Sequence, residues 1–588
     1  MKSSHPRRLR LRLELVDNGV FESSRVDSVL ERLARLSPLQ RVEFERCLRT
    51  RRVRGHDLVA QGLKAQGITH VYAMAGLPTD ETIGCCATAG LRTIGVRHQQ
   101  AAVMAAAAHN YLAGRLISVA LVSSGVAVTN AITGVCVAQD NGWPVLLLAG
   151  AAERAAEGMG AFMALDGVRV LAGLAKACFR VARPELVEQM LAAAIREAGE
   201  GRPGAVYVEL PEDCLEASVA LAFVRTEDPR PVVVEAHCNL ALVEQAAELL
   251  MRAKRPAVIF GKGVRWNDAY LVLRELVERL GAPFVASPMG RGLLPDDHPL
   301  ACTAQQSRVL AEADVVLVVG ARLNWTFRYG AELRRDARIM QIDCAPEAFR
   351  EGPPRALEML GAAATILPVL LTQVRALQAG AGGSERWQWL ASLHQAVAEQ
   401  PARCSSATLP TPSQLAAALA VALPRDAITI LDGNVTLLAA QRHISALTPL
   451  SRLTPGTNGC MGIGLPFAMG AALACPGRPV VLVTGDMALS MNFFEFETAV
   501  RHRVPFVVVL ANNDGPCGAR RQHKAFPADC AERVLVYQAG IRYDEMARQL
   551  GVHAENIAEL AELPAALARA FAPGRPALVQ IQIDPLAG

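Results

Sequence analysis

A carboxylate and an amide that could bind one metal ion follow two neighbouring apolar strands near the C-terminus. The segment VVLVTG predicts a strand ending at Asp486, 495–502 predicts a helix, and 506–510 predicts a strand that stops before Asn513. In such a βαβ unit, both strand ends open onto one crevice. Asp486 and Asn513 could therefore share one hard cation through oxygen ligands, with backbone groups facing anionic oxygens. We expect Mg²⁺ holding a diphosphate.

This unit resembles the diphosphate-binding motif of thiamine diphosphate enzymes, in which a GD pair, a helix and an NN pair follow one another. The resemblance implies that Asp486, Asn513 and the Gly515 carbonyl hold Mg²⁺. It also implies that Met487 and Ala488 contact the cofactor, although the family usually has a small residue where this chain has Met487. An ordinary βαβ unit with a capping Asp and a turn Asn is the structural alternative.

Other blocks extend the resemblance along most of the chain. The segment SRLTPGTNGCMGIGLPF from Ser451 resembles the stretch that holds the aminopyrimidine ring of the cofactor. By this resemblance, the Gly459 carbonyl accepts from the ring amino group, Met461 is the apolar wedge that bends the cofactor, and Asn434 contacts it. A Gly-rich turn before a buried helix is the alternative. Near the N-terminal side, HDLVAQGLKAQGITHVYAMAG, IGVRHQQAA and LVSSGVAVTNAITGVCVAQDNGWPVLLLAG follow the pyrimidine-binding domain of the family.

The RHQQ motif departs from the family at Gln99. Family members usually have a glutamate there, whose carboxyl group exchanges a proton with the aminopyrimidine nitrogen. An amide can form a hydrogen bond but cannot supply an ionisable proton. Loss of a positioned acid–base group costs on the order of 100- to 10,000-fold, although glyoxylate carboligases also lack the glutamate. Gln99 and His98 are the candidate catalytic residues, with His98 either relaying a proton or serving a structural role.

Within the family, the chain most resembles 2-hydroxyacyl-CoA lyases and oxalyl-CoA decarboxylases. The resemblance is carried by AAER from Ala151, SPMGRGLLPDDHPL from Ser287 and GARLNW from Gly320. In that subgroup, the middle domain resembles a nucleotide-binding fold that takes ADP or the adenosine end of CoA. Basic groups suit phosphates and a strand-end carboxylate suits a ribose, although each basic residue alone could be a solvated surface charge. The candidate residues are Arg154, Lys262, Arg322 and Asp343.

The composition is typical of a large α/β enzyme. The chain has 588 residues, of which 51% are hydrophobic and 5% aromatic, so we expect several domains. Neither an uninterrupted membrane-spanning run nor a hydrophobic signal core is evident, so we expect a cytoplasmic protein without membrane contact. The 14 cysteines form no CxxC pair, which indicates reduced thiols. A net charge of +4 gives no indication of nucleic-acid binding.

We expect an α/β fold with three doubly wound parallel-sheet domains and an N-terminal helical extension. By resemblance to the family, the cofactor lies between the two outer domains across a subunit interface of a homodimer or homotetramer. The predicted limits are 1–54 for the extension, 55–221 for the pyrimidine-binding domain, 232–377 for the nucleotide-like middle domain and 406–588 for the diphosphate-binding domain.

Residues 1–54 contain 14 Lys and Arg against 7 Asp and Glu. Their pattern predicts a helical pair, which resembles the short helical segments that join modules in nonribosomal peptide and polyketide assembly lines. The extension therefore either docks an acidic acyl or peptidyl carrier protein or packs on its own enzyme.

The resemblance implies a lyase or carboligase that uses thiamine diphosphate and Mg²⁺ to break or make a carbon–carbon bond next to a carbonyl. The substrate is then a 2-oxo acid or a 2-hydroxyacyl or oxalyl thioester. The chain stops at IDPLAG, where the CoA-type relatives continue into a segment over the thioester, so we expect a carrier-bound thioester or free acid rather than free CoA. Two alternatives stay open. One is an acetolactate-synthase-like carboligase on free 2-oxo acids, favoured by His98. The other is a catalytically impaired scaffold or regulatory subunit, favoured by Gln99 and Met487.

Overall fold

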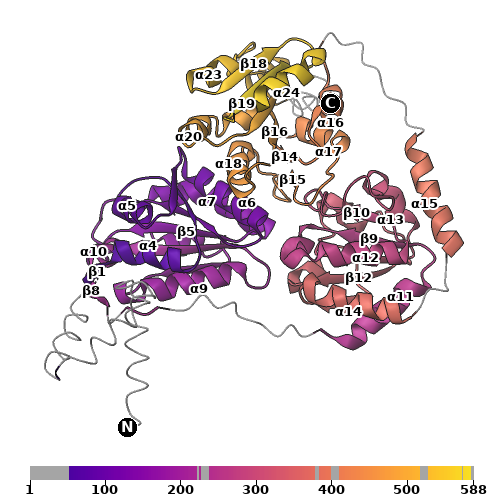
Figure 1. The fold of residues 1–588 in the computed structure, drawn as a ribbon, viewed down its shortest axis with the longest axis horizontal. Coiled ribbons are helices and arrows are strands. Elements are labelled where there is room, and N and C mark those ends of the chain that lie inside the picture. The colour runs from indigo at the N-terminus through magenta and orange to yellow at the C-terminus, as the bar shows by residue number, and fades with distance from the viewer. Residues whose placement is uncertain are drawn as a thin grey trace.

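The protein is described here by a computed structural model that covers residues 37, 52–221, 224–226, 238–377, 383–398, 409–516, 527–572 and 574–584. These residues form three parallel sheets flanked by helices (Figure 1). The predicted fold class is therefore confirmed for the three domains. The predicted helical extension lies outside the described residues, except for residue 37 and for residues 52–54, which form the strand β1 (Arg52–Arg54) and not part of a helix. No helix in the described part is long and apolar enough to cross a membrane.

The first sheet, indigo to purple in Figure 1, has the strand order β3-β2-β4-β5-β7-β6. Its central strands are buried along their whole length, as expected for parallel strands covered on both faces. The strands are β2 (His70–Ala73), β3 (Arg92–Gly95), β4 (Ser118–Val122), β5 (Val145–Ala151), β6 (Ala177–Arg180) and β7 (Ala205–Pro211). The helices are α4 (Gly55–Ala65), α5 (Asp80–Thr88), α6 (Gln99–Ala113), α7 (Val126–Asn141), α8 (Gly167–Leu171), α9 (Val187–Gly199) and α10 (Glu212–Glu216). A separate antiparallel pair joins β1 (Arg52–Arg54) to β8 (Ser218–Ala220).

The middle sheet has the order β10-β9-β11-β12-β13. Its strands are β9 (Pro256–Phe260), β10 (Phe284–Ala286), β11 (Val315–Val319), β12 (Arg338–Asp343) and β13 (Leu357–Leu360). The helices are α11 (Leu240–Arg252), α12 (Tyr270–Leu280), α13 (Gln306–Glu312), α14 (Ala363–Ala376) and α15 (Gly383–Ala398). The buried Arg386 of α15 donates to the carbonyl oxygens of Ala253 and Leu280, at the ends of α11 and α12. The helix α15 therefore packs on the middle domain.

The third sheet, orange to yellow in Figure 1, has the order β15-β14-β16-β17-β19-β18. Its strands are β14 (Ile428–Leu431), β15 (Arg452–Leu453), β16 (Val480–Gly485), β17 (Val507–Asn512), β18 (His553–Ile557) and β19 (Ala577–Gln582). The helices are α16 (Pro412–Ala422), α17 (Val435–His443), α18 (Gly464–Ala474), α19 (Asp486–Ser490), α20 (Glu495–Arg501), α22 (Ala528–Leu535), α23 (Tyr543–Gln549) and α24 (Leu563–Phe571). The domain limits given above stay predictions.

The helices α6 and α18 pack against each other between the first and third domains (Figure 1). Both consist largely of small apolar residues and are mostly buried. A Cβ at Gly470 would lie only 2.3 Å from the carbonyl oxygen of Ala105, so the helices could not approach this closely with a larger residue there. This contact positions the first turn of α6, and with it Gln99, against the third domain.

Candidate functional site

The structure contains the predicted βαβ unit, with α20 between the parallel neighbours β16 and β17. Gly485 lies opposite Ala511 in the register of these strands. Asp486 begins α19 directly after β16, and Asn513 follows β17 directly. The sheet therefore brings the two predicted metal ligands to one edge.

Asp486, Asn513 and Gly515 are linked by hydrogen bonds. Oδ2 of Asp486 accepts from the Gly515 N–H at 2.7 Å, and Nδ2 of Asn513 donates to the Gly515 carbonyl at 2.6 Å. Asp486 is only 1% exposed, and burial raises the pKa of its carboxyl group to about 6. Its Oδ1 has no hydrogen-bond partner among the described residues. An unpartnered buried oxygen is costly, and a cation would satisfy it.

These donors fit Mg²⁺, which prefers carboxylate and carbonyl oxygens. Gly515 has a φ of 126°, and a Cβ there would lie 2.9 Å from the Leu535 carbonyl oxygen, so its backbone requires glycine. The amide nitrogen of Asn513 donates to the Gly515 carbonyl, and ligation of Mg²⁺ would use the other amide atom, Oδ1. The neighbouring Met487 is half-buried and Ala488 is buried in α19.

A buried carboxylate that sequence reasoning missed holds the loop around Met461. Asp432 follows β14 and accepts from the N–H groups of Gly462 at 3.3 Å and Gly464 at 2.8 Å. Burial raises the pKa of this carboxyl group to about 6. Its signal in the sequence is a carboxylate directly after an apolar strand, the same signal that pointed to Asp486. Asp432 therefore ties the predicted aminopyrimidine-binding loop to the third sheet.

One cavity of about 1770 Å³ joins two groups of predicted residues. Asn434, Gly459 and Met461 line it from the third domain. The middle domain contributes the predicted nucleotide-contacting residues Lys262, Arg322 and Asp343.

Both basic and acidic side chains line the middle-domain end of this cavity. Burial lowers the pKa of Lys262 to about 7, and its Nζ donates to Oδ1 of Asn141 at 2.6 Å. Burial raises the pKa of Asp343 to about 6. Arg322 donates to Glu351 at 3.0 Å. Arg202, which sequence reasoning missed, reaches the cavity from the first domain. The sequence feature that could have pointed to Arg202 is the GRPG turn directly before β7.

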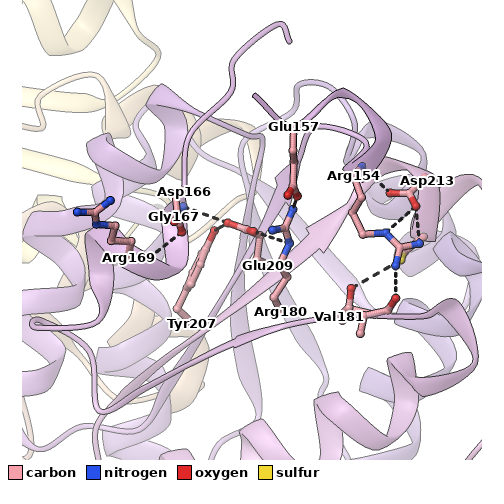
Figure 2. A network of polar contacts seen from close by, with 12 residues as sticks. Arg154, Glu157, Asp166, Gly167, Arg169, Arg180, Val181, Tyr207, Glu209 and Asp213 are labelled. Carbon is pink, nitrogen blue, oxygen red and sulfur yellow. Dashed lines mark hydrogen bonds and ion pairs between the residues drawn. The ribbon is translucent and has the colours of Figure 1, made fainter. Parts of the chain in front are cut away.

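The structure does not bring Arg154 to this cavity. Its Nε donates to Oδ2 of Asp213 at 2.7 Å, and the guanidinium also donates to the Ala182 carbonyl (Figure 2). In the same view, the carboxylate of Glu209 accepts from the Tyr207 hydroxyl group at 3.1 Å. The Arg154 guanidinium is therefore hydrogen-bonded to other residues of the same chain.

Gln99 is the first residue of α6 and is only 8% exposed. Its Oε1 accepts from Nδ2 of Asn130 at 3.1 Å. His98 caps the helix, because its Nδ1 accepts from the Gln100 N–H at 3.2 Å. Burial lowers the pKa of His98, which favours the neutral ring that this capping bond requires.

Two residues of the third domain, both missed in the sequence, hold the RHQQ motif. Oε1 of Glu495 accepts from the N–H groups of Arg97 and His98, each at 3.0 Å. Asn492 accepts from the Gln100 side chain at 3.1 Å through Oδ1 and donates to the Gly462 carbonyl at 2.6 Å through Nδ2. The motif is thus linked to the loop that follows Met461. The only sequence signal was the position of these polar residues at the start of the predicted helix.

Comparison with known proteins agrees with this arrangement. Residues 53–170 match the N-terminal TPP-binding domain of thiamine pyrophosphate enzymes, 243–370 the central domain and 433–581 the C-terminal TPP-binding domain. The chain belongs to the thiamine pyrophosphate enzyme family. The resemblance inferred from the sequence is thereby confirmed, and the protein is a thiamine diphosphate-dependent lyase or carboligase.

Relatives in this family span nearly the whole chain. A 2-hydroxyacyl-CoA lyase of Arabidopsis thaliana is 30% identical, with 91% of this chain and 96% of the relative covered. An oxalyl-CoA decarboxylase of Escherichia coli is 31% identical, with 91% and 95% covered. A probable acetolactate synthase of Mycobacterium bovis is 32% identical, with 90% and 95% covered. The relatives of this chain therefore include enzymes named for CoA substrates and an enzyme named as an acetolactate synthase.

Proposed function

We propose that this thiamine diphosphate enzyme makes or breaks the carbon–carbon bond next to the carbonyl of a 2-hydroxyacyl or oxalyl thioester. The cavity that joins Gly459 and Met461 to Lys262 and Asp343 carries the proposal. Its volume of about 1770 Å³ exceeds the roughly 300–1,000 Å³ of ordinary small-ligand sites. A thioester on a nucleotide-bearing arm is large enough to contact both groups of lining residues, whereas a free 2-oxo acid is too small to contact both. The lyase and decarboxylase relatives support the same substrate class.

Asp486, Asn513 and Gly515, which do not line the cavity themselves, would hold Mg²⁺ for the diphosphate of the cofactor. Thiamine diphosphate, when bound, supplies the stabilisation of negative charge on the reacting carbon. The Gly459 carbonyl and the Met461 side chain orient the cofactor, with Asn434, Met487 and Ala488 as further contacts. Oδ1 of Asp486, which has no hydrogen-bond partner among the described residues, supports the metal assignment.

Gln99 contacts the pyrimidine in this proposal. Its amide can donate or accept a hydrogen bond there but cannot supply an ionisable proton. His98 positions the first turn of α6 through its capping bond rather than relaying a proton. The subunits form a homodimer or homotetramer, as thiamine diphosphate enzymes usually do.

At the other end, Lys262 and Arg322 bind the phosphates of CoA or ADP, and Asp343 binds the ribose. A role for Arg154 in this site stays a prediction, since its guanidinium would first have to leave Asp213. A carrier protein docked on residues 1–54 would present the same pantetheine arm without the nucleotide.

The test is product analysis after incubation with Mg²⁺, thiamine diphosphate and, separately, oxalyl-CoA, a 2-hydroxyacyl-CoA, an acyl carrier thioester and pyruvate. We expect turnover of a thioester, lost in Asp486→Ala and kept in Asp529→Ala, which removes an exposed carboxylate of α22. Turnover of pyruvate alone would overturn the thioester proposal. Cofactor binding without turnover of any candidate would favour the scaffold or regulatory role.

A second candidate is an acetolactate-synthase-like carboligase on free 2-oxo acids. The acetolactate synthase relative favours it, because it is 32% identical over 90% of this chain. In that case, formation of a condensation product from pyruvate would be insensitive to substitutions at Lys262 and Asp343.

A further inference from the structure

We propose that Asn130 of α7 is a positioning residue that turns the amide N–H₂ group of Gln99, and not its carbonyl oxygen, towards the aminopyrimidine ring of the cofactor. Gln99 then donates a hydrogen bond to the ring nitrogen and holds that nitrogen in its unprotonated form. The inference rests on the proposed function, because it takes Gln99 as the residue that contacts the pyrimidine.

The Gln99 amide uses its oxygen within the chain and leaves its nitrogen for a ligand. Oε1 accepts from Nδ2 of Asn130 at 3.1 Å, whereas Nε2 makes no hydrogen bond with any residue that the structure describes. The Gln99 side chain is buried, so little water is present to replace Asn130 at the oxygen. An amide whose oxygen is bonded in this way presents two N–H donors.

Close packing of α6 against α7 makes this contact possible. Gly134 lies one helical turn after Asn130, and a Cβ at Gly134 would lie 2.7 Å from Cβ of Val103 and 2.8 Å from the Gln100 carbonyl oxygen. A larger residue would push the two helices apart. The glycine therefore lets α7 approach the first turns of α6, where Asn130 reaches Gln99.

The charged side chains around Gln99 do not orient its amide. Oε1 of Glu495 accepts from backbone N–H groups of the RHQQ motif, and the Arg97 guanidinium lies 3.6 Å from a carboxylate of α20. The His98 ring caps α6, and the neighbouring turns of α7 carry no charge. Within the part of the chain that the structure describes, Asn130 is therefore the one side chain that is hydrogen-bonded to the Gln99 amide.

The orientation of the amide decides which state of the ring nitrogen is favoured. A facing N–H donor stabilises the unprotonated nitrogen, whereas a facing oxygen stabilises the protonated one. Asn130→Asp should reverse the orientation, because a carboxylate can only accept. The Gln99 amide must then turn its N–H₂ group towards residue 130, and its oxygen faces the ring.

The test compares two ligands of the full-length protein by calorimetry with Mg²⁺, above neutral pH. One is thiamine diphosphate, and the other is an analogue in which the ring nitrogen facing Gln99 is replaced by C–H. The measured quantity is the ratio of the two dissociation constants, analogue over cofactor. Gln99→Leu gives the ratio without an amide. We expect the ratio of the parent to be about tenfold higher, the scale of one hydrogen bond.

Asn130→Asp should lower the ratio to the Gln99→Leu level or below it, because an oxygen then faces the unprotonated nitrogen. In the Gln99→Leu background, Asn130→Asp should have no further effect, as expected for a residue that acts through Gln99. Thr129→Asp is the matched control, since it places the same charge on the adjacent exposed residue, whose hydroxyl group donates to the Val126 carbonyl. It should keep the ratio of the parent.

The outcomes separate the inference from the proposed function. If the parent and Gln99→Leu give the same ratio, Gln99 does not contact the ring nitrogen, and that part of the proposed function falls with the inference. If the ratio of the parent is lower than that of Gln99→Leu, the amide presents its oxygen, and the inference alone is overturned. It is also overturned if Asn130→Asp keeps the ratio of the parent or if Thr129→Asp lowers it equally. If Asn130→Asp does not fold, Asn130→Ala takes its place and should also lower the ratio, because the amide is then free to turn.

Discussion

The carboxylate of Glu495 accepts a hydrogen bond from the backbone N–H of His98 at 3.0 Å, from a position 397 residues away in the sequence. The same oxygen accepts from the N–H of Arg97. Both donors lie directly before α6, so the third domain holds the segment that carries Gln99. Burial raises the pKa of Glu495 to about 7, because few polar groups replace water around it.

Glu495→Ala should lower the melting temperature by several degrees. It leaves two backbone donors without an acceptor, at about 1–3 kcal/mol each, and each kcal/mol corresponds to about 2–4 °C in a domain of this size. Glu495→Gln should remain close to the parent, because an amide oxygen can still accept both bonds. Glu545→Ala is the control, since it removes an exposed ion pair with Arg542 and has no hydrogen bond or ion pair with the RHQQ motif among the described residues. Equal losses in all three variants would contradict the assigned role of Glu495.

Gln99→Glu should restore the ionisable group that the family usually has at this position. We expect exchange of the thiazolium C2 proton, followed by nuclear magnetic resonance, to become faster by on the order of 100-fold. Products should shift towards the protonated aldehyde, because a carboxyl group at position 99 can supply the proton that the amide cannot. Gln100→Glu should leave the exchange rate unchanged, because the Gln100 side chain faces Asn492. If Gln99→Glu alters neither exchange nor products, Gln99 does not contact the pyrimidine.

ADP binding should be accompanied by proton uptake above neutral pH. Burial holds the pKa of free Lys262 near 7, and a bound phosphate favours its ammonium form and raises that pKa. Affinity should therefore fall as pH rises through about 7, by up to about tenfold per pH unit. Titration calorimetry in buffers of different ionisation enthalpy measures the uptake. Lys262→Met should abolish it, and Lys254→Met, at an exposed ion pair, should not. Uptake that persists in Lys262→Met would exclude this lysine as its source.

Gly515→Ala should weaken magnesium-dependent binding of thiamine diphosphate. The residue has a φ of 126°, and the new Cβ would lie 2.9 Å from the Leu535 carbonyl oxygen, at a strain of about 1–3 kcal/mol. The shifted backbone would disturb the hydrogen bonds that join the Gly515 N–H to Asp486 and the Gly515 carbonyl to Asn513. Gly540→Ala is the control, because it also has positive φ but meets no atom within 4 Å. Unchanged cofactor affinity, measured by calorimetry, would remove Gly515 from the metal site.

Removal of residues 1–51 tests the predicted docking extension. This boundary keeps β1, whose Arg52 pairs with Ala220 of β8, so the first domain should remain intact. We expect slower turnover of a carrier-bound substrate, unchanged turnover of small free substrates, and a smaller difference at high salt. A lower melting temperature with equal loss on every substrate would show that the extension packs on its own enzyme.

The sequence by itself determined the three-sheet architecture and the sheet edge at which Asp486 and Asn513 meet. Buried parallel strands are continuous apolar runs, and the residues after them fall at the carboxyl edge of the sheet whatever the remaining structure. Asp486 and Asn513 could be predicted for that reason. Lys262, Arg322 and Asp343 were named only through family resemblance, yet they too lie at strand ends of one sheet, Lys262 after β9, Arg322 after β11 and Asp343 as the last residue of β12.

The tertiary structure alone decided which distant segments meet. Glu495 reaches His98, and Asn141 reaches Lys262, only because separate domains pack together, and no local pattern encodes such a contact. Packing within the first domain placed Arg154, which follows β5, on Asp213 of α10 instead of in the cavity. Hydrophobic periodicity specifies the faces of each element, whereas the partner of a polar side chain depends on how complete domains are oriented.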